Sequence, residues 1–120
     1  MKKVGILLLM LCLAAIPLAA NNAVLHDNAT RLAGLLADTQ DKATIGAAAW
    51  KSIANEALTY TGRLYLNRTP KTDTDVKEAR KHCLEMNRAA MKGDVDGAKS
   101  HAAQALPYVY KVIDATAPKK

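Results

Sequence analysis

Apolar side chains recur at helical spacing along most of the chain, and no stretch alternates convincingly between apolar and polar residues with a period of two. The first set is Leu32, Leu35 and Leu36, which share one face of a helix because Leu35 and Leu36 follow Leu32 by three and four residues. The polar residues 38–42 predict a short turn after this helix. A kinked continuation of the helix is the alternative interpretation of that polar run.

The start of this first helix is expected near residue 27. Residues 21–27 are mostly polar, which predicts a loosely ordered segment. Asp27 or Asn28 follows at the point where a side-chain oxygen can accept the first backbone N–H bonds of a helix.

A second helix is predicted from about residue 43 to residue 67. It ends in a loop at residues 67–73, because Pro70 disfavours the helical conformation at Thr69. Trp50 flanks the apolar stripe of this helix. The stripe consists of Ile45, Ala49, Ile53, Ala57, Tyr60 and Leu64.

A third helix is predicted from about residue 74 to residue 92. Its apolar positions are 3, 4, 3 and 4 residues apart, which is the spacing of a coiled-coil seam. Gly93 can adopt the left-handed conformation that ends a helix, and Asp94 can cap the next one. The seam consists of Val76, Ala79, Cys83, Met86 and Ala90.

The fourth helix contains a proline within its apolar pattern. Pro107 has no N–H to donate to the carbonyl of Ala103, so we expect a kink or a restart there. The apolar positions of this helix are Ala98, His101 or Ala102, Ala105, Val109 and Val112.

Together these patterns predict an all-α, antiparallel four-helix bundle made of two helical hairpins, residues 24–67 and 72–115. Residues 51–60 and 99–108 both read K-S-x-A-x-x-A-L-x-Y, with six of ten positions identical. This similarity indicates a duplicated hairpin. A chance match between two Ala/Leu-rich helices is the alternative.

The N-terminus has the pattern of a secretory signal peptide. Two lysines precede an uncharged run from Val4 to Ile16, and small residues follow. We predict cleavage after Ala20, with Ala23 as the alternative, so that residues 1–20 form the signal peptide and 21–120 a single domain. The chain is then periplasmic or secreted, without stable membrane insertion after cleavage. The alternative is that the apolar segment is retained as an N-terminal anchor.

Charge and motifs restrict the function further. Cleavage leaves a net charge of about +4, with no aromatic residues interleaved among the basic ones, which argues against a nucleic-acid partner. Cys83 is the one cysteine after residue 20, so no disulfide can form within the mature chain. The sequence contains no nucleotide-binding glycine loop, nucleophile elbow or H-E-x-x-H motif, and we predict no enzyme activity.

One cluster of side chains suits a metal ion. His82 and Met86 share a helix face, and the turn at residues 93–94 places His101 of the next helix about level with Met86. Imidazole, thiol and thioether groups together favour copper, and zinc is the borderline case. The predicted ligands are His101, His82, Cys83 and Met86. The alternative is that Cys83 and Met86 are ordinary core residues and that the histidines lie at the surface.

The run from Gly93 to Leu106 resembles the small metal-binding protein family, which consists of exported bacterial four-helix bundles. The match to its G-x-x-x-x-A-x-x-H-A-x-x-A-L pattern includes His101, whereas the duplicate segment has Ile53 at that position. The resemblance implies binding of divalent metals, copper especially, through histidines on helix surfaces. Of those histidines, the motif carries over His101.

The same stretch is also similar to two other groups of proteins. The spacing from Ala89 to Leu106 resembles a tetratricopeptide hairpin, which binds peptides, and residues 79–99 resemble the YfdX-like periplasmic proteins linked to acid stress. These resemblances imply a helical interaction or chaperone-like module with an unidentified protein partner and no metal. The oligomeric state stays open.

Overall fold

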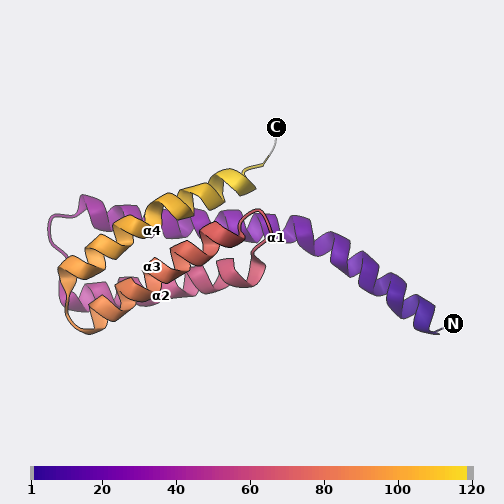
Figure 1. Cartoon of the computed structure of the whole chain (residues 1–120), viewed down its shortest axis with the longest axis horizontal. Coiled ribbons are helices and arrows are strands. Elements are labelled where there is room, and N and C mark those ends of the chain that lie inside the picture. The colour runs from indigo at the N-terminus through magenta and orange to yellow at the C-terminus, as the bar shows by residue number, and fades with distance from the viewer. Residues whose placement is uncertain (1, 119–120) are drawn as a thin grey trace.

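The protein is a bundle of four helices, shown in Figure 1. The computed structural model describes the backbone of residues 2–118 and the side chains of residues 22–118, so the side chains of the predicted signal peptide lie outside the described set. The helices are α1 (Lys2–Asp41), α2 (Ala47–Asn67), α3 (Asp73–Met91) and α4 (Val95–Thr116). Residues 2–118 contain no strand. The predicted all-α four-helix bundle is confirmed.

Each helix packs against its neighbour in the chain, and α4 returns to pack against α1. The order of the helices around the bundle is therefore their order in the sequence, as in an up-down-up-down topology. Figure 1 shows the first half of α1 extending beyond the other three helices. Over residues 22–118, whose side chains are described, no helix is both long and apolar enough to cross a membrane.

The core follows the predicted pattern most closely in α3 and α4. All five seam positions of α3 are buried. In α4 the buried member of the ambiguous pair is Ala102, while the side chain of His101 is only half-buried. The buried apolar residues are Leu25, Ala29, Leu32, Ala33, Leu36, Trp50, Ala54, Ala57, Leu64, Val76, Ala79, Cys83, Met86, Ala89, Ala90, Ala98, Ala102, Ala105, Val109 and Val112.

The predicted start of the first helix is wrong. Residues 21–27 are helical, and neither Asp27 nor Asn28 caps a helix, because α1 runs through both positions. The side chain of Leu25 is fully buried and precedes Ala29 by four residues, so the core face begins before the polar segment ends. Packing of Leu25 against the bundle explains why this segment is helical.

The predicted turn at residues 38–42 is also displaced. The helix α1 continues to Asp41, with the buried Thr39 hydroxyl donating to the carbonyl of Leu36 at 2.6 Å. Lys42 and Asp38 form an ion pair of 2.9 Å at i,i+4 spacing, which suits a helical backbone. The turn therefore occupies residues 42–46, and α2 begins four residues later than expected.

The core face of α2 is centred differently from the prediction. Trp50 is 1% exposed and belongs to the core, whereas Ala49 is exposed and Ile53 and Tyr60 are only partly buried. An indole buries far more apolar area than an alanine methyl group, so its packing sets the rotation of the helix. The buried residues of α2 are Trp50, Ala54, Ala57, Thr61 and Leu64.

The turn between α3 and α4 agrees with the prediction. Gly93 has a φ of 76°, in the left-handed region that favours glycine, and the Asp94 side chain accepts a hydrogen bond of 2.9 Å from the backbone N–H of Gly97. The helix α4 then continues through Pro107 without a restart. Both Pro107 and Ala103 are exposed, so water can bond the carbonyl that proline leaves without a donor.

Candidate metal site

Two of the predicted ligands lie side by side across the α3–α4 interface. The ring centroids of His82 on α3 and His101 on α4 are 5.8 Å apart, and the ring planes are tilted by 30°. The short turn at residues 92–94 makes α3 and α4 antiparallel neighbours, which brings His101 back alongside α3.

A tyrosine completes the aromatic group. The ring of Tyr108 stacks on His82, with centroids 5.9 Å apart and an interplanar angle of 16°. Tyr108 lies seven residues after His101, so both side chains project from the same face of α4. The Lys111 amine is 5.3 Å from the centre of the tyrosine ring. The i,i+7 spacing of His101 and Tyr108 in the sequence indicates this shared face, although Tyr108 was not among the predicted site residues.

The two histidines share an unusual feature. The Nδ1 atoms of both rings are buried, and neither has a hydrogen-bond partner among the described residues. Buried polar atoms in proteins are nearly always paired, and those that are not often contact a water molecule or an ion. The pair thus offers two ring nitrogens without protein partners, on rings whose centroids are 5.8 Å apart.

The surroundings favour the neutral form of His82. Burial of its ring lowers the pKa of His82, and the nearby charge of His101 lowers it further. Neutral imidazole has the lone pair that a metal ion requires, so the ring needs to lose no proton near neutral pH before coordination.

The sulfur-containing residues of the predicted ligand set lie in the core. The side chains of Cys83 and Met86 are both fully buried. Burial raises the pKa of the Cys83 thiol to about 12, so it stays protonated near neutral pH, whereas the thiolate is the form that binds metals. Their burial fits the alternative that both residues serve the packing of the bundle.

No larger ligand group surrounds the histidines. Across the side chains that the structure describes, no three His, Cys, Asp or Glu residues are close enough to hold one metal ion. The two imidazoles are therefore the nitrogen ligands that this site offers, and any further ligands come from solvent or from rearranged core side chains.

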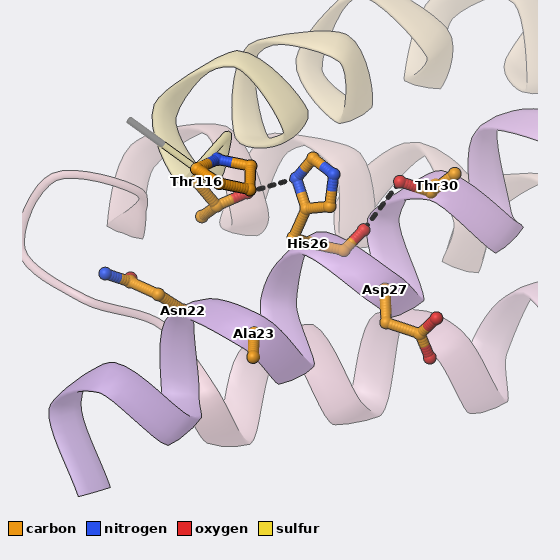
Figure 2. A pocket seen from close by; sticks show the side chains of 7 residues that line it. Asn22, Ala23, His26, Asp27, Thr30 and Thr116 are labelled. Atoms are coloured by element: carbon orange, nitrogen blue, oxygen red, sulfur yellow. Dashed lines mark hydrogen bonds between the residues drawn. The ribbon is translucent and has the colours of Figure 1, made fainter. Parts of the chain in front are cut away.

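The third histidine lies elsewhere, beside a pocket between α1 and the end of α4. Figure 2 shows the Nδ1 atom of His26 against the hydroxyl of Thr116, at 3.2 Å. Thr116 follows His101 by fifteen residues, roughly 22 Å along the helix. His26 is consequently too far along the bundle to share a metal with the other two. The residues lining its pocket are Asn22, Ala23, His26, Asp27, Thr30, Thr116 and Pro118.

Comparison with known proteins adds no relative. No family model matches the chain, and neither the curated proteins nor the solved structures include a significant match.

Proposed function

We propose that the mature protein is an exported, non-catalytic helical bundle that binds one copper or zinc ion between His82 and His101. The observation that carries this proposal is the pair of buried, unpartnered Nδ1 atoms on rings 5.8 Å apart. The resemblance of residues 93–106 to the small metal-binding protein family supports the same conclusion through His101.

The ring separation suits a shared ion. A metal–nitrogen bond of about 2.0–2.1 Å puts the ion about 3.2 Å from a ring centroid, so two ligating rings are about 5.2 Å apart at a tetrahedral angle and about 6.4 Å apart in a linear arrangement. The observed separation of 5.8 Å lies between these limits.

The number of protein ligands favours copper over zinc. It also predicts a modest affinity. Structural zinc sites use four protein ligands and catalytic ones use three. Two imidazoles suit copper, whose selection depends on ligand type and geometry. The originally predicted Cys83 and Met86 complete the coordination only if their sulfur atoms turn out of the core, which costs the packing that they now make.

Metal titration tests the proposal directly. We expect the protein that begins at Asn21 to bind one equivalent of copper(I), measured anaerobically by competition with a chromogenic chelator, or of zinc, measured by calorimetry. His82→Ala and His101→Ala each remove one of the two nitrogens, so each weakens binding by about tenfold or more.

The matched control is His26→Ala, which removes an imidazole of the same chain outside the site and leaves the affinity unchanged. Equal losses in all three variants, or no binding by the wild type, contradict the proposal. A metal-free interaction module then becomes the better account of this bundle.

A further inference from the structure

The outer face of α3 has a composition that neither the core nor the histidine pair explains. At about 100° of rotation per residue, seven side chains from Lys77 onward fall within roughly 120° of arc. Five are basic and two are apolar; Asp73, the first residue of α3, lies on the same face four residues before Lys77, and Lys92 directly follows the end of the helix. They are Lys77, Arg80, Lys81, Leu84, Arg88, Met91 and Lys92.

The net basic charge after residue 20 is concentrated in residues 68–92, where α3 itself has four basic and four acidic residues and the excess comes from Arg68 and Lys71 before the helix and Lys92 after it. Residues 68–92 contain seven lysines and arginines against four acidic residues, whereas the rest of the chain after residue 20 contains eight against seven. Three of the four net positive charges therefore belong to about a quarter of the mature chain.

The basic side chains are available to a partner. Among the described residues, Arg80, Lys81 and Lys92 form no ion pair. Lys77 pairs with Asp73 at 3.1 Å and Arg88 with Glu85 at 2.6 Å, but the side chains of both basic residues are more than half exposed. Exposed pairs of this kind are weak and exchange readily for another anion.

One end of the face is held in place by aromatic packing. The guanidinium groups of Arg68 and Arg80 lie 3.9 Å and 4.8 Å from the centre of the Tyr65 ring. Contact with the ring face orients both groups. Arg68 is also paired with Asp73 at 2.7 Å, whereas Arg80 lines a shallow groove beside the ring. The same groove is lined by Tyr65, Lys77, Arg80, Lys81, Leu84, Glu85 and Arg88.

Two apolar side chains accompany the basic ones. Met91 is 61% exposed, and Leu84 is half-buried. Five basic residues spread over fifteen residues of helix cover about 22 Å, which is longer than one small anion and matches a row of separate phosphates. A mixture of basic and apolar side chains on one helix face is typical of helices that lie on a membrane surface.

We propose that this outer face of α3 docks the protein reversibly on an anionic phospholipid surface, with the basic side chains contacting headgroup phosphates and Met91 reaching the boundary with the acyl chains. The proposal is independent of the metal site, because His82 lies on a different side of α3, against α4. A free phosphate offers the same chemistry singly, and an acidic protein offers carboxylates instead.

Vesicle co-sedimentation of the protein that begins at Asn21 tests this. We expect binding to vesicles of phosphatidylcholine with phosphatidylglycerol, little binding to phosphatidylcholine alone, and loss of binding as salt is raised. Each basic residue near such a surface contributes about a fivefold change in partitioning. The triple variant Lys81→Gln, Arg88→Gln, Lys92→Gln should then bind roughly a hundredfold more weakly.

The control variant removes the same charge from the other three helices. Arg31→Gln, Lys51→Gln and Lys111→Gln change one arginine in an exposed ion pair and two exposed lysines, as the test variant does. We expect this control to retain most of the vesicle binding. Equal loss in both variants shows a net-charge effect and overturns the proposal.

Two further outcomes also overturn it. Binding to polyglutamate without binding to anionic vesicles identifies an acidic protein as the partner. Loss of vesicle binding at millimolar inorganic phosphate, but not at equal ionic strength of chloride, identifies a site for one phosphate. Failure of the metal titration leaves all of these outcomes unchanged.

Discussion

The ring centroid of His82 is 5.8 Å from that of His101 and 5.9 Å from that of Tyr108, and burial is the main cause of its lowered pKa. Because burial and the charge of His101 lower the pKa of His82 in the folded protein, the unfolded chain takes up a proton at this residue at higher pH than the folded chain does. The folded state is therefore favoured above the unfolded pKa of about 6.5, and this contribution is lost as the pH falls below it.

A pH series of thermal unfolding measures this contribution. We expect the Tm of the metal-free wild type to fall between pH 7.5 and pH 5.5 more steeply than that of His82→Gln. Circular dichroism at 222 nm provides the unfolding curves. Identical slopes for the two proteins would show that His82 titrates alike in the folded and unfolded states.

Some features of the histidine pair could be predicted from local sequence signals and others could not. The proximity of α3 and α4 at His101 follows from a short glycine–aspartate turn, which is a local signal and can be read from the sequence. Whether the Nδ1 atoms have hydrogen-bond partners depends on the rotation of each side chain and on every neighbour within bonding distance. Their lack of partners therefore could not be predicted from the local sequence. Burial of Cys83 was implied by the seam, and the resulting pKa follows from that burial.

Among the elements, α2 shows where alanine-rich patterns mislead. Alanines occupy both exposed positions, such as Ala49, and buried ones, such as Ala54 and Ala57, so they do not mark a face. The single tryptophan decides the rotation instead. The pattern of α3 predicted the correct face because Val76, Cys83 and Met86 mark it between polar residues at regular spacing, whereas in α4 it left His101 and Ala102 as alternatives.

Substitution in α2 tests this account. We expect Trp50→Ala to lower the free energy of unfolding by about 3–5 kcal/mol, because it leaves a large cavity at a residue that is 1% exposed. Leu66→Ala, at a side chain that is 82% exposed, should change it by less than about 0.5 kcal/mol. Urea denaturation followed by circular dichroism gives both values, and similar effects would place Trp50 outside the core.

For the whole molecule, the position of Leu25 limits where the predicted cleavage can fall without loss of core packing. Leu25 is fully buried, whereas Asn22, Ala23 and Val24 are exposed. Cleavage after either Ala20 or Ala23 therefore leaves the core complete. The start of the core face was not predicted from the sequence, because only a short polar segment separates it from the apolar residues of the predicted signal peptide.

Truncation measures this limit. We expect a protein that begins at Asn21 to unfold at the same urea concentration as one that begins at Val24. A protein that begins at Asn28 should lose about 2–5 kcal/mol, as for removal of a buried leucine. The comparison requires equal denaturant slopes for the three proteins, and equal midpoints would show that Leu25 adds nothing to the core.

The hydrogen bond between His26 and Thr116 brings the end of α4 beside the part of α1 where the core face begins. When the two ends of a domain lie close together, they can be joined and the chain opened elsewhere with little change to the folded structure. A short glycine–serine linker from Pro118 to Asn22 and a new opening between Lys42 and Gly46 would produce a circular permutant with the same core. Such a molecule would begin with the second half of one hairpin and end with its first half.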